Sequence, residues 1–403
     1  MQAHPARSAG TVRVPLDYRR PDGPGVEIHV SQVRASGHLR GVLVINEGGP
    51  GPHLADASAF GGLAPRSLPA VYDVISFDQR GFGRCASVSC GLSPQEQAEI
   101  PPWPQRDGEP ASPVQARRVA AKCAARAGGE MPFLGTANVA LGISYGSYLG
   151  AAYASMYPQH TDRTFLNVVR LRDRDPLDTP VGAVAGTQLR IGLFASMYSD
   201  AVGAARAGEE LQVWFSDENT AAGQLGVFCA DRRWTRSVAR YDREARIDAR
   251  RYPLTGGAGS SIWPCAFWPS DPIDPPVRAV DRGPDNILLI NNLHDPVTTY
   301  ADALSLRRQF GDRARLVGVD HGGHGSYLLA GNMCANQAGT AFLLGGPLAA
   351  HDFTCPANSA GPAGPSAHAG LWAGASVPGG STTARSFKEI IYNERTVAQP
   401  TVT

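Results

Sequence analysis

Short, uninterrupted apolar runs that each end in a polar or glycine-containing loop constrain the fold of this chain more than any other feature. Val42 to Ile45 leads into the loop Gly48 to Gly51, and Val74 to Phe77 leads into Asp78 to Gly81. Strands that are apolar on both faces are typical of the centre of a parallel sheet. Helix-compatible stretches separate the later runs, so the order predicts a mostly parallel sheet flanked by helices. The predicted strands are residues 11–18, 26–33, 41–46, 72–78, 165–169, 287–290 and 314–319.

The pattern changes twice along the chain and suggests an insertion and a tail. With 403 residues, the chain can form one large domain with a sizeable insertion. Residues 170–276 are rich in alanine and arginine in helical patterns, and we interpret them as a cap over the sheet. Residues 1–169 and 277–355 would then form the α/β core. Residues 356–403 begin rich in alanine, glycine, proline and serine and are expected to form a C-terminal tail.

The charge balance and the apolar content argue against several classes of partner. The 37 basic and 36 acidic side chains leave a net charge of +1, so we expect no nucleic-acid partner. No uninterrupted run of about 18 apolar residues is present, so we expect no membrane span. The glycine-rich loop lacks the G-K-[ST] and GxGxxG patterns of nucleotide sites. We therefore expect no cofactor, and the sequence is silent on the oligomeric state.

The cysteines favour structural disulfides over a metal site. The seven cysteines lack CxxC spacings, and widely separated pairs would suit an oxidising, extracellular setting. The start of the chain shows no basic segment followed by an apolar stretch, so no signal peptide is visible. We expect a secreted protein whose signal has been removed, and the alternative is a cytoplasmic protein with reduced thiols.

Gly142 to Gly146 has the G-x-S-x-G pattern of a nucleophilic serine, with Ser144 at its centre. A serine that attacks a carbonyl is held on a tight turn from strand to helix, and the turn needs small residues two positions away on each side. The alternative is a plain glycine-rich turn, since the chain has 46 glycines. The apolar run Val139 to Leu141 before the motif and the small-residue stretch Tyr148 to Met156 after it favour the nucleophile.

Asp295 and His324 follow Ser144 in the order that a serine, acid and histidine triad requires, each just after a predicted strand. The carboxylate would orient the imidazole, which would take the proton of the serine. Alone, Asp295 before Pro296 could be simple turn chemistry, and His321 with His324 could be metal ligands. The joint order favours the triad, with no metal and with His321 as a supporting residue.

Two backbone N–H groups must stabilise the oxyanion of the tetrahedral intermediate. In this arrangement one comes from the residue after the nucleophile, which is Tyr145, and the other from a loop after an early strand. The loop Gly48 to Gly51 is suitable, and we expect Gly49 to be the second donor.

Together these motifs resemble the secreted tripeptidyl aminopeptidase-like serine exopeptidases of actinomycetes, which are relatives of the prolyl iminopeptidases. The resemblance implies an α/β-hydrolase fold, Ser144, Asp295 and His324 as the triad, and a helical cap that reads the free N-terminus of the substrate. It also implies the disulfides Cys90–Cys123, Cys229–Cys265 and Cys334–Cys355, with Cys85 as a buried, inert thiol. The matching segments are residues 14–18, 46–51, 72–83, 142–150, 295–298 and 323–325.

Two departures from the resembled family bear on the substrate. Glu47 stands where these proteins usually have proline, beside the oxyanion loop, where it would either bind an amine or be solvated. The stretch Phe133 to Gly142 is also short for the strand and helix that normally precede the nucleophile. Similar compression occurs near residues 170 and 201, so the nucleophile is better defined than the substrate.

We therefore expect a serine hydrolase that cleaves amide bonds near the free N-terminus of short peptides through an acyl-enzyme. One alternative keeps the triad and changes the substrate, to that of an esterase, an amidase or a natural-product tailoring hydrolase acting on a small amide or ester. A more remote alternative is a non-catalytic binding protein on a hydrolase scaffold.

Overall fold

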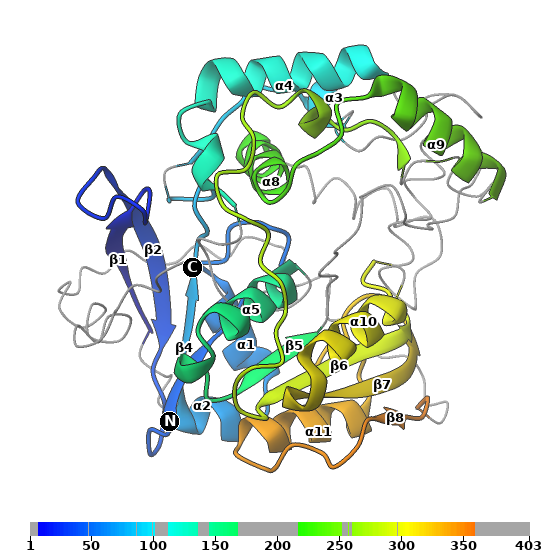
Figure 1. The fold of residues 1–403 in the computed structure, drawn as a ribbon. Helices are drawn as coiled ribbons and strands as arrows, with labels where there is room; N and C mark the ends of the chain where they lie inside the picture. Colours follow the sequence, from blue (N-terminus) through cyan, green and yellow to red (C-terminus); the bar gives the residue numbers. More distant parts are fainter. Residues whose placement is uncertain are drawn as a thin grey trace.

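In the computed structural model, the described residues are 7–46, 48–85, 87–98, 100, 112–135, 145–167, 217–251, 257, 260–295 and 297–358. They contain two four-stranded sheets (Figure 1), in the orders β1-β2-β4-β3 and β5-β6-β7-β8. In the first sheet β1 and β2 pair antiparallel, β2 and β4 pair antiparallel, and β3 and β4 pair parallel. Every pairing of the second sheet is parallel. The strands are β1 Arg7–Pro15, β2 Gly25–Val33, β3 Gly41–Val44, β4 Tyr72–Phe77, β5 Thr164–Asn167, β6 Ile287–His294, β7 Ala314–Gly322 and β8 Phe353–Cys355.

The predicted mostly parallel sheet with flanking helices is confirmed, and each predicted strand is present. Strand β6 differs in length, because it continues past Ile290 to His294. Two consecutive asparagines, Asn291 and Asn292, therefore lie within a strand and are fully buried. The helices are α1 Asp56–Leu63, α2 Ser67–Val71, α3 Pro94–Ala98, α4 Pro113–Ala127, α5 Tyr145–Met156, α8 Glu218–Ala230, α9 Val238–Arg251, α10 Tyr300–Phe310 and α11 Met333–Leu343.

Helices cover both faces of the second sheet. Because successive side chains of a strand point to opposite faces, Ile287 and Leu289 pack on one side, against α5 and α10. Leu288 and Ile290 pack on the other side, against α11. Burial on both faces explains why the run is continuously apolar. One core also joins the two sheets, since the ring of Phe165 in β5 lies 4.8 Å from that of Tyr327 in a cluster shared with β3 and β4.

N-cap side chains, from the residue directly before the helix, fix where three helices begin. Asp217 accepts a hydrogen bond from the backbone N–H of Thr220 at the start of α8. Thr299 does the same at α10 and Asn332 at α11. These caps satisfy backbone donors that have no partner inside the helix. Two helices that flank the second sheet, α10 and α11, and helix α8 of the upper layer therefore have defined starting points.

A second layer of helices lies over the sheets, in the upper part of Figure 1, and contains α4, α8, α9 and a 3₁₀ turn, η5 Pro264–Phe267. Helix α8 is enclosed, and every residue from Thr220 to Val227 is buried. Its glycines allow close approach: a side chain at Gly223 would meet the ring of Phe82, and one at Gly226 would meet Leu134. Helices α8 and α9 belong to the predicted cap, but α4 comes from before it in the sequence.

The predicted domain boundaries stay predictions. Residues 168–216, which include the first part of the predicted cap at 170–276, lie outside the described part of the chain. Residues 359–403, which make up most of the predicted tail, lie outside it as well. Among the described residues, no helix has the length and apolar character needed to cross a membrane.

Candidate active site

The acid candidate, Asp295, comes directly after β6 and is 4% exposed. Its Oδ1 accepts hydrogen bonds from the backbone N–H groups of Val297 and Thr298, both at 2.8 Å. Its Oδ2 accepts the hydroxyl of Thr298, also at 2.8 Å. Burial alone would raise the pKa of Asp295, but the hydrogen bond and charge of His324, together with the bonds from Thr298, hold the pKa below its usual value. Asp295 is therefore an ionised carboxylate at neutral pH.

The histidine candidate, His324, lies in the loop after β7 and is 8% exposed. Its Nδ1 is 3.0 Å from Oδ2 of Asp295 and 3.2 Å from Oδ1. An ionised carboxylate can only accept hydrogen bonds, so Nδ1 must carry the shared proton. The other ring nitrogen, Nε2, then has the lone pair that a general base needs. In this arrangement His324 could act as a general base that Asp295 orients.

The expected oxyanion loop follows β3, and its backbone requires glycine. Gly48 has a φ of 107° and Gly49 a φ of 97°, which side chains rarely permit. The backbone N–H of Gly48 donates to Oδ1 of Asn46 at 3.0 Å, and Asn46 is fully buried. Asn46 therefore holds the start of the loop, a role that sequence reasoning missed although the residue belongs to the matched motif.

The start of α5 lies against the same asparagine. A Cβ on Gly146, the second glycine of the serine motif, would be 2.6 Å from the carbonyl oxygen of Asn46 and 2.7 Å from its Oδ1. Tyr145, which begins α5, is 7% exposed. The two backbone segments that are expected to supply the oxyanion donors, at Gly49 and Tyr145, therefore approach each other at Asn46.

Helix α8 extends over the oxyanion loop. Nε2 of Gln224, which is 6% exposed, donates to the carbonyl oxygen of Pro50 at 3.1 Å. At the start of the helix, Asn219 donates to the carbonyl oxygens of Gly81 and Val88 at 2.7 and 2.8 Å. The upper helical layer is thus attached to the sheet layer at the loops where the predicted site lies.

Two predicted site residues, Ser144 and Glu47, lie outside the described residues, so their roles stay predictions. His321, the predicted supporting residue, is half-buried. Among the residues that the structure describes, no three His, Cys, Asp or Glu side chains gather where they could hold a metal ion.

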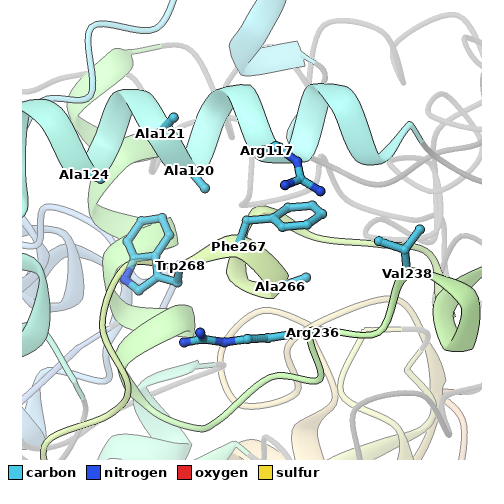
Figure 2. Close-up of a pocket in the computed structure, with 9 residues that line it drawn as sticks. All are labelled: Arg117, Ala120, Ala121, Ala124, Arg236, Val238, Ala266, Phe267 and Trp268. Atoms are coloured by element: carbon cyan, nitrogen blue, oxygen red, sulfur yellow. The ribbon is translucent and has the colours of Figure 1, made fainter.

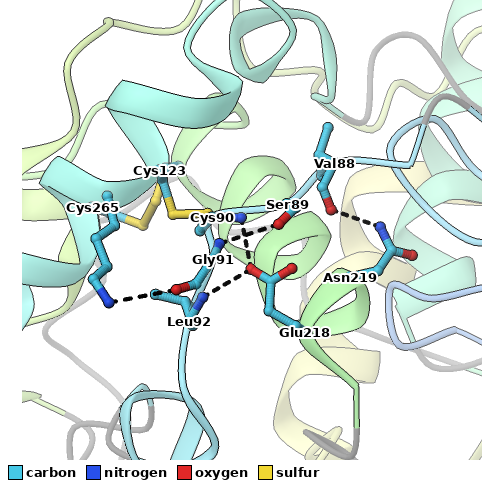
Figure 3. Close-up of a disulfide and its surroundings, with 11 residues drawn as sticks. Val88, Ser89, Cys90, Gly91, Leu92, Cys123, Glu218, Asn219 and Cys265 are labelled. Atoms are coloured by element: carbon cyan, nitrogen blue, oxygen red, sulfur yellow. Dashed lines mark hydrogen bonds between the residues drawn. A yellow bond between two sulfur atoms is a disulfide. The ribbon is translucent and has the colours of Figure 1, made fainter.

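The cysteine pairs are those that the family resemblance implied. Figure 3 shows the disulfide of Cys90 with Cys123, which attaches the loop before α3 to α4. Oε1 of Glu218, at the start of α8, accepts the N–H groups of Cys90 at 2.7 Å and Leu92 at 3.2 Å. Burial raises the pKa of the remaining thiol, Cys85, to about 12, so it is a poor nucleophile. The other two disulfides are Cys229–Cys265 and Cys334–Cys355.

A cavity of about 450 Å³ lies between α4 and the turn η5, within the upper helical layer (Figure 2). The guanidinium of Arg117 stacks over the ring of Phe267 at its edge, 4.3 Å from the ring centroid. None of the predicted site residues lines this cavity. It is separate from the Asp295 and His324 pair.

Comparison with known proteins finds similarity to a tripeptidyl aminopeptidase and to a serine protease. Residues 253–355 match the TAP-like protein family. A tripeptidyl aminopeptidase from Streptomyces lividans is 26% identical over 451 aligned positions, which cover 86% of this chain and 83% of that protein. The serine protease Hip1 of Mycobacterium tuberculosis is 24% identical over 447 positions, covering 84% and 85%. A solved serine hydrolase from Cycloclasticus zankles has a TM-score of 0.41 and 12% identity, covering 84% of this chain and 99% of that one.

The alignment with the Streptomyces protein is longer than the 403 residues of this chain, so that relative carries segments that are missing here. With its mostly parallel sheets and flanking helices, the chain has the α/β-hydrolase fold, and along most of its length it is similar to a tripeptidyl aminopeptidase of Streptomyces and a serine protease of Mycobacterium.

Proposed function

We propose that this protein is a serine peptidase that cleaves amide bonds near the free N-terminus of short peptides. The observation that carries the proposal is the buried pair of Asp295 and His324, with 3.0 Å between the carboxylate and the imidazole. The likeness to tripeptidyl aminopeptidases along most of the chain supports a peptide as the substrate.

In the proposed reaction, the hydroxyl of Ser144 attacks the carbonyl carbon of the scissile amide and its proton passes to Nε2 of His324. Asp295 stabilises the imidazolium that forms. The N–H groups of Gly49 and Tyr145 are the proposed donors to the oxyanion. His324 then protonates the leaving amine, and water releases the acyl group from Ser144 by the same steps in reverse order.

Recognition of the N-terminal amine is the part of the proposal that separates a peptidase from an esterase. Glu47 adjoins the glycine loop in the sequence and is our candidate for binding the amine. Glu47→Gln should then raise KM for a tripeptide p-nitroanilide with a free amine, and it should leave the hydrolysis of the N-acetylated compound unchanged.

The test of the proposed function compares three substrates with the purified protein: a tripeptide p-nitroanilide, its N-acetylated form and p-nitrophenyl acetate. We expect the first to be cleaved best and acetylation to lower kcat/KM, with Ser144→Ala inactive on all three. A protein that hydrolyses the ester but neither anilide would instead be an esterase on the same triad. Activity retained in Ser144→Ala would refute the whole proposal.

The three disulfides are typical of proteins that fold in an oxidising compartment. We propose that the protein acts outside the cytosol, where free peptides would be its substrates.

A further inference from the structure

Asn292 holds the backbone on both sides of His324. It lies in β6, is fully buried, and directs its side-chain amide at the loop after β7. Nδ2 donates to the carbonyl oxygen of Gly323 at 3.0 Å and to that of Gly325 at 3.2 Å, with a longer bond of 3.5 Å to that of Gly322. The carbonyls of Gly323 and Gly325 belong to the residues immediately before and after His324. The side chain of Asn292 therefore restrains the backbone on both sides of the residue that carries the imidazole.

The loop around His324 needs such a restraint. Gly323 has a φ of 78° and Gly325 a φ of 90°, conformations that glycine adopts freely, and β7 ends at Gly322. The pairing of β6 with β7 is also irregular here, because Asn292 is opposite Val319 whereas His294 is opposite Gly322. Neither helix nor regular strand pairing then sets the position of residues 323–325, and the bonds from Asn292 restrain their backbone on both sides of His324.

The preceding residue, Asn291, restrains the acid loop in the same way. Its Nδ2 donates to the carbonyl oxygen of Thr298 at 2.8 Å. Thr298 in turn donates its N–H and hydroxyl to the carboxylate of Asp295. Adjacent residues of a strand point to opposite faces, so this pair of asparagines reaches two different loops. The acid and the base are both attached to the end of one strand.

We propose that Asn292 is a positioning residue of the hydrolase: it sets the imidazole of His324 against Asp295 and the nucleophile through the two flanking carbonyls. The inference rests on the proposed function, since it assumes that His324 is the base. Misplacement of a catalytic group by about 1 Å costs about 10²-fold in rate, so a loop free to shift by that distance would lower turnover while leaving substrate binding largely intact.

The alternative is that Asn292 only satisfies buried carbonyls, and the chain contains a matched control for that role. Asn286 precedes the other end of β6, is 7% exposed, and also donates to two backbone carbonyls of another segment. Its acceptors are Thr161 at 2.5 Å and Asp162 at 2.9 Å. Asn286→Ala and Asn292→Ala thus each remove a buried amide that donates to at least two backbone carbonyls, and only the second lies beside His324.

The experiment measures both variants in the full chain, with the rate of fluorophosphonate labelling, kcat and KM for p-nitrophenyl acetate, and the unfolding midpoint. We expect similar losses of stability in the two variants. Only Asn292→Ala should show labelling and kcat reduced by about 10- to 100-fold, with KM changed by less than about threefold. The downfield proton resonance of the bond from His324 to Asp295 should be lost or broadened in Asn292→Ala and retained in Asn286→Ala.

Equal kcat and labelling in the two alanine variants, with the downfield resonance intact in both, would overturn the inference. If Asn292→Ala does not fold, Asn292→Ser is compared with Asn286→Ser on the same readouts. His324→Gln distinguishes this failure from failure of the proposed function. An inactive His324→Gln beside a fully active Asn292 variant refutes only the positioning role, whereas wild-type labelling in His324→Gln refutes the triad itself.

Discussion

Replacing Gly146 by alanine tests whether the start of α5 and the oxyanion loop are held against each other. The added Cβ would lie 2.6 Å from the carbonyl oxygen of Asn46, about 0.8 Å closer than the 3.4 Å at which ordinary contact begins. The obstructing atoms are backbone oxygen and the Oδ1 that binds Gly48, not the end of a flexible side chain. Helix α5 or the loop must therefore move.

Two magnitudes follow from this overlap. Forcing an extra methyl group into a packed site costs about 1–3 kcal/mol of folding stability. A movement close to 1 Å between the segments that carry Tyr145 and Gly49 should lower kcat by about 10²-fold, because the oxyanion donors lose their alignment.

The assay combines thermal unfolding with kcat and KM for p-nitrophenyl acetate. Gly61→Ala is the matched control, since a Cβ at this position in α1 meets no atom within 4 Å. It should keep wild-type kcat and gain a few tenths of a kcal/mol, up to about 1, because alanine favours the helix over glycine. Wild-type kcat and stability in Gly146→Ala would refute the packing argument for the oxyanion site.

Three further predictions concern the acid, the free thiol and a disulfide. The pKa of Asp295 in the folded protein is below its unfolded value of about 3.9. The stability that its ionised carboxylate contributes is therefore present above that pH and is lost as the pH falls through the folded-state pKa. Urea unfolding from about pH 6 to pH 3 should show a weaker pH dependence of stability in Asp295→Asn than in the wild type, and an equal pH dependence would contradict the shift. Cys85 should not react with a thiol reagent in the folded protein, because it is buried. After unfolding without reduction, the reagent should detect a single thiol per chain. A fast reaction in the folded state would show that Cys85 is accessible. Replacing both Cys90 and Cys123 by alanine removes a disulfide that joins residues 33 positions apart. The free energy of unfolding, measured in denaturant, should fall by about 3–4 kcal/mol. An unchanged denaturation midpoint would show that this disulfide does not stabilise the layer around α4.

The centre of the second sheet could be predicted because burial on both faces produces a continuous apolar run. Ile287 to Ile290 was recognisable for this reason, whereas the run Val42 to Ile45 is continuously apolar although Val42 is exposed. The extension of β6 was not recognisable, because Asn291 and Asn292 have the residue type of a loop. Their burial depends on carbonyls in the loops after β6 and β7, at Thr298, Gly323 and Gly325. The sequence around a buried asparagine does not show which distant carbonyl groups will accept hydrogen bonds from its amide.

The upper helical layer shows the same limit. Helix α4 begins at a proline and has alternating buried and exposed residues, so its helical character can be read locally. Nothing in that pattern says that it packs with α8 and η5, which come about a hundred and more residues later in the chain. The predicted cap, residues 170–276, therefore gives no indication that α4 lies in the same layer as α8 and α9. Long-range packing, rather than propensity, decides which helices share a layer.

In the candidate site, the order of the motifs was enough to pair Asp295 with His324, because parallel strands bring their carboxyl ends to one edge of a sheet. The residues that hold this pair, Thr298 and Asn292, have no motif of their own. Their hydroxyl and amide act through bonds of 2.8 to 3.2 Å that exist only once both loops are placed. Asp295 and His324 could be predicted from their residue types and their order in the sequence. Thr298 and Asn292 could not, because their roles depend on the three-dimensional placement of two loops.

The most direct test of the central claim is the site of covalent labelling by a fluorophosphonate, located by mass spectrometry of the digested protein. We expect a single labelled residue, Ser144, and no labelling in Ser144→Ala or after unfolding. Asp295→Asn should be labelled about 10³- to 10⁴-fold more slowly than the wild type. A label on another residue, or labelling of Asp295→Asn at the wild-type rate, would contradict the proposed serine hydrolase.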